Sequence, residues 1–81
     1  MVMKYVMFDF VYPVIFSICM PHNQVSYKGL KPTSAGFVKF IWDDEKQEVD
    51  VICYGESISL ELKSLGCIDA DIIKTFVSSE V

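Results

Sequence analysis

Apolar and polar residues alternate along much of the chain with the two-residue period of β-strands. Residues 3–10 are rich in β-forming side chains, and residues 14–18 form a second such run. Pro13, just before the second run, is compatible with the start of a strand or with a strand at the edge of a sheet. The pattern predicts an N-terminal hairpin whose tight connection is formed by residues 9–12.

Residues 34–42 predict a strand that is apolar on nearly both faces. Such a strand is typical of the centre of a sheet, or of a surface that a partner covers. One face carries Val38, Phe40 and Trp42. We expect these three side chains to form an interface with a second copy of the chain.

Two more strands are predicted after this one. Residues 43–48 are mostly charged and form a solvated turn, whereas residues 49–54 alternate cleanly and place Cys53 on a buried face. Gly55 tolerates the positive φ that a two-residue hairpin turn requires. Residues 57–62 then show the clearest alternation in the chain. The side chains expected to face the core there are Ile58, Leu60 and Leu62.

The C-terminal residues follow a helical period instead. Asp69 is the predicted N-cap, and Asp71 favours the positive end of the helix dipole. A helix of about ten residues is not stable alone in water, so its apolar stripe must dock on the sheet. That stripe consists of Ile72, Ile73, Phe76 and Val77. The predicted fold is α+β: a single domain, residues 1–81, with about five mostly antiparallel strands and a short C-terminal helix packed on one face.

A polar segment, residues 21–34, separates two apolar runs. Pro21 could begin one helical turn, and Gly29 and Pro32 prevent a longer helix. A loop of this length is uncommon in a compact domain and is usually functional. Its apolar anchors are Val25, Tyr27, Leu30 and Phe37. The candidate binding residues, expected to point outward, are His22, Asn23, Gln24, Lys28 and Lys31. The alternatives are a packed connector in place of this loop and a contact through the acidic turn 43–48.

The composition predicts self-association. Of 81 residues, 52% are hydrophobic and 14% aromatic, which is more than so small a core can enclose. A homodimer is the simplest way to cover the surplus, although single exposed apolar side chains are also common on small domains.

The charge is uneven. Residues 1–40 carry four lysines against Asp9 alone, whereas residues 41–81 carry three lysines against ten acidic residues, for a total of −4. There is no arginine, so the bidentate contacts that recognise phosphate or guanine are missing. This makes direct nucleic-acid binding an unfavourable interpretation. The acidic half is either a solvated face or a surface that is aimed at a basic protein or imitates a nucleic-acid backbone.

The candidate chemistry is sparse. Three cysteines and one histidine match no structural zinc spacing, so no metal ligand and no cofactor are predicted. Cys19 and His22 are three residues apart and are the only candidates for a nucleophilic dyad. We predict no catalytic residues. Unpaired thiols indicate a reducing cytoplasm, and Asp9 and Pro13 interrupt any signal peptide or membrane span in residues 1–20.

At "KYVMF", "PVIF", "SAGFV", "CYGES" and "LKS…DADII" the chain resembles a set of small proteins carried by bacteriophages and prophages. These motifs are structural in character: strand residues, a turn glycine and a helix cap. No activity is established for that set, so no functional residue is carried over. The resemblance implies a phage or mobile-element product acting in the host bacterial cytoplasm.

The sequence leads to one function hypothesis and one alternative. The first is a non-catalytic binding protein, encoded by a phage or mobile element, that occludes a host or phage macromolecule. The alternative is an oligomeric binder of a small anionic metabolite or nucleotide, held by His22, Lys28 and Lys31.

Overall fold

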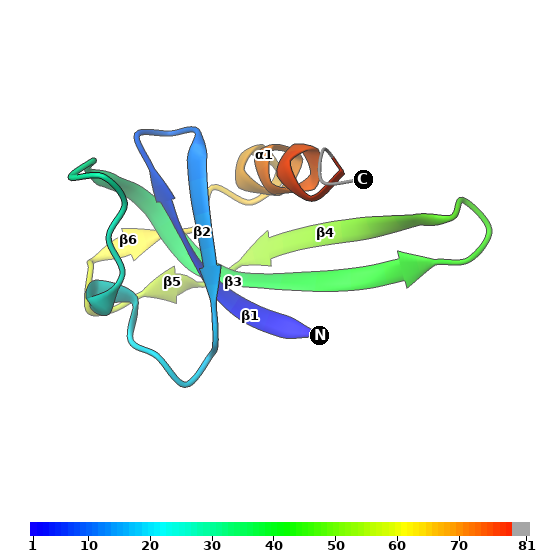
Figure 1. Ribbon diagram of the computed structural model, residues 1–81. Coiled ribbons are helices and arrows are strands. Elements are labelled where there is room, and N and C mark those ends of the chain that lie inside the picture. The colour runs from blue at the N-terminus through cyan, green and yellow to red at the C-terminus, as the bar shows by residue number, and fades with distance from the viewer. Residues whose placement is uncertain (79–81) are drawn as a thin grey trace.

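The computed structural model describes residues 1–78 and has the α+β architecture that the sequence predicts (Figure 1). The last three residues of the predicted domain, 79–81, lie outside the described part. A four-stranded antiparallel sheet has the order β2-β1-β3-β4, and β5 and β6 form a separate two-stranded sheet. The elements are β1 (Val2–Phe8), β2 (Tyr12–Phe16), the 3-10 helix η1 (His22–Gln24), β3 (Pro32–Asp43), β4 (Glu48–Tyr54), β5 (Glu56–Ser57), β6 (Leu62–Lys63) and α1 (Cys67–Ser78).

The predicted N-terminal hairpin is confirmed as β1 and β2. Phe8 pairs with Tyr12, and the three residues between them turn the chain with positive φ at Asp9 and Phe10 (51° and 65°). β2 is an edge strand, which explains why it tolerates Pro13, a residue without an N–H to donate.

The two faces of the sheet are covered by different parts of the chain. We call the face under α1 the helix face; its buried core is Tyr5, Met7, Val38 and Cys53, packed against Ile73. We call the opposite face the loop face; its buried residues are Val6, Phe8, Phe16 and Ala35. Residues of the connecting segments lie over the loop face: Val25, Tyr27, Leu30, Leu60 and Leu62. The predicted docking of the helix on one face is therefore confirmed.

A buried polar cluster attaches α1 to the sheet. The Asp69 carboxylate accepts hydrogen bonds from the Tyr5 hydroxyl at 2.5 Å, the Ser34 hydroxyl at 2.8 Å and the Leu65 backbone N–H at 3.0 Å. α1 begins at Cys67, so the prediction that Asp69 is the N-cap was wrong: it lies within the first turn and points into the protein. Its position is set by these tertiary partners rather than by the helix end.

The cluster also fixes protonation states. Burial raises the pKa of the Tyr5 phenol well above its ordinary value, and the hydrogen bond to Asp69 adds to the shift. Burial, together with the negative charge of Asp69, raises the pKa of the Cys53 thiol to about 12. Both groups are therefore neutral at physiological pH, and Cys53 is a buried structural thiol, as predicted.

The prediction of one strand over residues 57–62 was wrong. Only Ser57 and Leu62 are in strands, and the residues between them form the turn that joins β5 to β6. The Ser57 hydroxyl accepts the backbone N–H of Leu60 at 3.2 Å, which closes this turn. Ile58, expected in the core, is 86% exposed as a result. Gly55 has the expected positive φ of 79°, but it lies between β4 and β5 and not in a hairpin turn.

The β3–β4 hairpin extends beyond the rest of the sheet. The pairing of β3 with β1 stops at Lys39, which lies opposite Val2, the first residue of β1. The pairing of β3 with β4 continues to Asp43 and Glu48. We call residues 39–52 of this hairpin the arm. It gives the molecule its elongated shape, 38 × 21 × 20 Å, and is seen at the right of Figure 1.

Candidate contact surface

The predicted binding loop contains one residue that does not point outward. His22 is 5% exposed, and its ring packs edge-on against Phe16 and Phe37. Its Nε2 is 2.9 Å from the carbonyl oxygen of Gly36, which can only accept, so Nε2 carries the proton and donates. The expectation that His22 faces solvent was therefore wrong, because an aromatic cage and a backbone carbonyl together satisfy the imidazole inside the protein.

The rest of the loop follows the prediction more closely. Val25, Tyr27 and Leu30 pack on the loop face, as expected for anchors. Positive φ at Lys28 and Gly29 (49° and 71°) turns the chain between Tyr27 and Leu30, and the Lys28 ammonium lies 5.3 Å from the centre of the Tyr27 ring. The exposed polar residues are Asn23, Gln24, Lys28 and Lys31.

Two residues of the alternative anion-binding hypothesis, His22 and Lys31, line different hollows. His22 lines an open depression of about 510 Å³ together with Lys4 and Phe37. Lys31 lines a different depression, of about 260 Å³, with Phe10 and Leu62. Within one chain the histidine and this lysine therefore face separate hollows.

The Cys19–His22 pair is not joined either. Cys19 is exposed, and its backbone N–H donates to the Ser17 hydroxyl at 3.1 Å. The His22 Nε2 is occupied by Gly36. Within residues 1–78 no group of three or more His, Cys, Asp or Glu side chains is placed to hold a metal ion. In the same part of the chain, no helix combines the length and the hydropathy needed to cross a membrane.

The three residues of the predicted interface have different environments. Val38 is fully buried beneath α1, so it belongs to the core and cannot contact a partner. Phe40 is partly buried against the same core. Trp42 is 57% exposed, and its indole N–H donates to the Asp44 carboxylate at 2.6 Å. Only the distal end of the predicted interface is therefore available on the surface.

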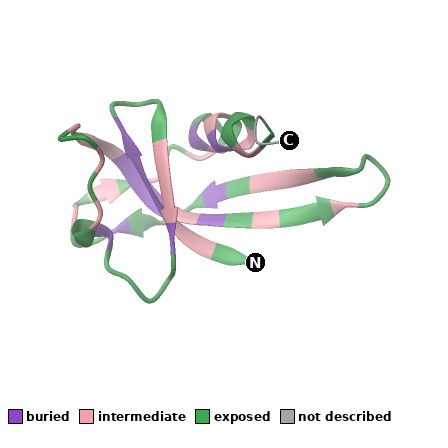
Figure 2. Ribbon diagram, viewed as in Figure 1, coloured by how far each residue is buried: buried purple, intermediate pink, exposed green. Residues whose placement is uncertain are grey.

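A larger apolar surface lies on the other face of the arm. We call it the outer strip: Val2, Ile41, Ile52 and Tyr54. These side chains are between 38% and 46% exposed. The strand register places them on one face, because Lys39 pairs with both Val2 and Ile52 while Phe37 pairs with Tyr54. Figure 2 shows the arm mostly in the exposed and intermediate colours, with the buried segments gathered at the centre of the sheet.

The sequence contains a signal for this strip, the apolar residue Ile41 on the second face of the predicted strand 34–42. Ile41 alternates with Trp42, and both were predicted to be in a strand with two apolar faces. Which face of this strand is exposed depends on where α1 and the polar segment pack on the sheet. The tertiary structure is needed to show this.

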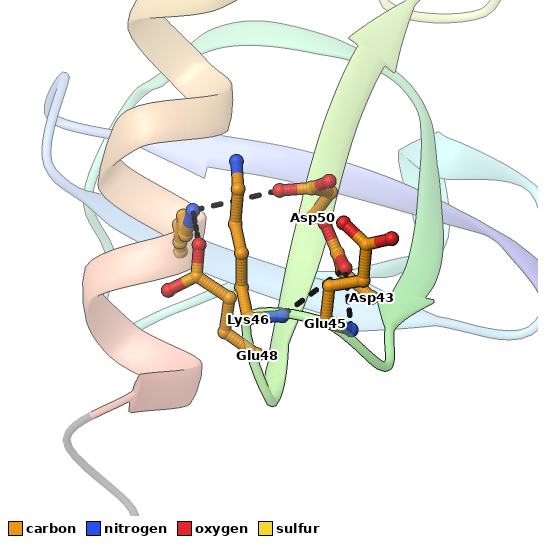
Figure 3. A network of polar contacts seen from close by, with 6 residues as sticks. Asp43, Glu45, Lys46, Glu48 and Asp50 are labelled. Atoms are coloured by element: carbon orange, nitrogen blue, oxygen red, sulfur yellow. Dashed lines mark hydrogen bonds and ion pairs between the residues drawn. The ribbon is translucent and has the colours of Figure 1, made fainter.

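The tip of the arm is acidic. Residues 43–50 contain five acidic side chains and one lysine, Lys46. The Asp43 carboxylate accepts the backbone N–H groups of Glu45 and Lys46 at 3.0 and 3.2 Å, which orders the turn (Figure 3). Lys74 of α1 lies 3.6 Å from Glu48 and 3.7 Å from Asp50. The remaining carboxylates give the tip a net negative potential.

The 510 Å³ depression adjoins the outer strip. Phe37 lines the depression and stacks on Tyr54 of the strip, with ring centroids 5.8 Å apart and an interplanar angle of 25°. The opposite wall is formed by the chain from Gly55 to Ser59, including the exposed Ile58. The apolar strip and the depression therefore form one continuous surface along the loop face.

Comparison with known proteins finds no matching family model, no matching curated protein and no matching solved structure.

Proposed function

We propose that the protein is a non-catalytic binding protein that contacts and occludes another macromolecule through its β3–β4 arm. The observation that carries this proposal is the arm itself: a projecting hairpin with exposed apolar side chains on both faces and an acidic turn at its end. Exposed apolar groups rimmed by charge are typical of protein interaction sites.

The charge of the tip indicates the kind of partner. Acidic residues attract basic proteins and repel nucleic acid, so they favour a protein partner with a positive surface. The phage-like motifs of the sequence support the further proposal that the partner is a host or phage protein in a bacterial cytoplasm.

The proposal is tested by affinity isolation from a bacterial lysate, with the wild-type chain and two matched variants. One variant carries Ile41→Glu and Trp42→Glu, which place a charge on each face of the arm. The other carries Lys28→Glu and Lys31→Glu in the predicted loop. We expect one stoichiometric partner with the wild type, its loss with the arm variant and its retention with the loop variant. If the partner were lost only with the loop variant, the contact surface would be residues 21–34 and not the arm.

Self-association is a second proposal, favoured by the exposure of Trp42. A homodimer through Phe40 and Trp42 predicts a sedimentation mass of twice 9.2 kDa at micromolar concentration. The substitution Trp42→Glu should then restore the monomer without unfolding it, because the indole is not part of the core. A monomeric wild-type chain would rule this proposal out and leave the arm free for another protein.

A further inference from the structure

The loop face of the sheet is covered at one end and exposed at the other. Val25, Tyr27, Leu30, Leu60 and Leu62 pack over the end that contains Phe8 and Ala35. This covering layer stops at the depression between His22 and Ile58. Beyond it the same face continues along the arm, and its apolar side chains stay exposed. A segment from another protein could extend the covering layer without moving any element of this chain.

The strand register arranges this surface in four rows. The first contains Lys4, Phe37 and Tyr54, the second Val2, Lys39 and Ile52, the third Ile41 and Asp50, and the fourth Asp43 and Glu48. Alternate residues of a strand are about 6.6 Å apart, so the surface from the first row to the fourth is about 20 Å long. The first two rows combine apolar side chains with Lys4 and Lys39, and the last two carry the acidic residues, so the charge changes sign along the surface.

The depression at the apolar end suits one large side chain. It is lined by Phe37, Pro21 and Ile58, with Lys4 and Glu56 at its sides. His22 lines it as well, with its ring held between Phe16 and Phe37 and its Nε2 bonded to the Gly36 carbonyl oxygen.

The helix face of the arm is a weaker candidate. α1 covers it as far as Val51, which packs against the buried core of the helix face. The indole of Trp42 already donates to Asp44 of the same chain. The loop face is therefore the longer unpartnered surface.

We propose that the loop face of the arm binds a basic, amphipathic protein segment, with an apolar side chain in the depression beside Phe37 and lysine or arginine residues against the acidic tip. The inference rests on the proposed function and specifies its partner. Charge complementarity selects this occupant. Residues 43–50 carry five acidic side chains against Lys46, and Lys74 pairs with Glu48 and Asp50, so this end of the surface keeps a net negative charge. A negative charge there repels anionic lipid and nucleic acid and attracts cationic side chains.

The test uses a random dodecapeptide display library selected on the immobilised wild-type protein. Enriched peptides should share an aromatic or branched apolar residue and at least two lysine or arginine residues, about six positions away if the peptide is extended. With a ¹⁵N-labelled protein, a synthetic copy of the best peptide should shift the amide signals of residues 37–43 and 50–54. It should leave those of residues 28–31 in place.

Two matched single substitutions separate the faces of the arm. Ile52→Glu lies on the loop face and Trp42→Glu on the helix face, and both replaced side chains are exposed in the wild type. Ile52→Glu should weaken the peptide at least about tenfold, and Trp42→Glu should change its affinity less than about twofold. The neutralising pair Asp43→Asn and Glu48→Gln should weaken it less than Ile52→Glu and should reduce its dependence on salt.

Several results would overturn the inference. They are an absence of enriched peptides, enrichment of acidic peptides, and a loss of binding with Trp42→Glu but not with Ile52→Glu. The last result would leave the proposed function intact and move the contact to the helix face. Binding to phosphatidylserine vesicles, or a dimer that Ile52→Glu dissociates, would instead assign the loop face to a membrane or to a second copy. The amide shifts of the wild-type protein test the inference even if a variant fails to fold.

Discussion

The two halves of β3 are nearly equally apolar in sequence and very different in environment. From Ser34 to Val38 the strand is mostly buried, because α1 covers one face and the segments after β2 and β5 cover the other. Its pairing with β1 stops at Lys39, and from there to Asp43 it continues beside β4 with most of its side chains exposed. We call the first half the body and compare it with the arm. The comparison teaches that burial in this chain is decided by which segments fold back, and much less by the strand's own hydrophobicity.

The largest expected effect concerns the attachment of α1 to the body. Asp69→Ala should destabilise the protein by about 3 kcal/mol or more, since the Tyr5 and Ser34 hydroxyls would lose a buried acceptor. Asp71→Ala, at an exposed position of the same helix, should change stability by less than about 0.5 kcal/mol. Urea unfolding measures both. Equal effects would mean that the buried cluster does not hold the helix.

A pair of substitutions within β3 tests the comparison directly. Val38→Ala should cost about 2 kcal/mol, because it removes two buried methyl groups from the core under α1. Ile41→Ala, three residues further along, should cost less than about 0.5 kcal/mol. If thermal denaturation gave Ile41→Ala the larger effect, the arm would be buried in solution, and self-association would be the first explanation to examine.

Alkaline pH should lower the free energy of unfolding, because Cys53 is buried in the body. The pKa of Cys53 is raised from 9.0 to about 12 in the folded protein, so above pH 9.0 the unfolded chain loses a proton that the folded chain keeps. The contribution of Cys53 to stability is therefore constant well below pH 9.0 and should fall above it, with a slope that approaches about 1.4 kcal/mol per pH unit by pH 10. Urea midpoints measured under reducing conditions should show this slope. Cys53→Ala should flatten it, and an unchanged slope would assign it to another group.

The raised pKa of Tyr5 extends the same effect. Its ordinary value is 10.0, so the phenol contributes a further loss of stability only above that pH. Tyr5→Phe should remove this upper part of the slope and leave the lower part, due to Cys53, unchanged.

The smallest expected effect concerns the contact between α1 and the arm. Lys74→Met removes two ion pairs that are partly exposed, so it should cost no more than about 0.5 kcal/mol in low salt and less in high salt. Amide hydrogen exchange should become faster at residues 48–50 and stay unchanged at residues 5–7. Faster exchange in both regions would mean that the arm and the body open together.

The sequence predicted the elements that carry a strong local signal. The β1–β2 hairpin, the alternation of β3 and β4 and the C-terminal helix were all expected, since β-rich runs and a helical stripe are visible within a short window. Residues 57–62 show the limit of this reasoning. They alternate well, but a strand needs a neighbour to pair with, and here the Ser57 hydroxyl bonds to Leu60 and closes a turn instead.

The errors at the candidate site have a common physical cause. His22 and Asp69 were assigned to the surface and to a helix end because they are polar, yet both are buried with partners far away in the sequence: Gly36 for the histidine, Tyr5 and Ser34 for the carboxylate. Val38 was assigned to an interface because a small domain was not expected to bury both apolar faces of the strand. Pairings at long sequence separation decided each case, and no local pattern contains them.

The exposed indole of Trp42 has a practical consequence for spectroscopy. It is the only tryptophan in the chain, and it is already in contact with water and with the Asp44 carboxylate when the protein is folded. Its emission should therefore lie at long wavelength in the native state and shift little when the body melts. A molecule that covers the tip of the arm would move that emission towards the blue, so the chain contains an optical probe of its arm that is nearly silent about its core.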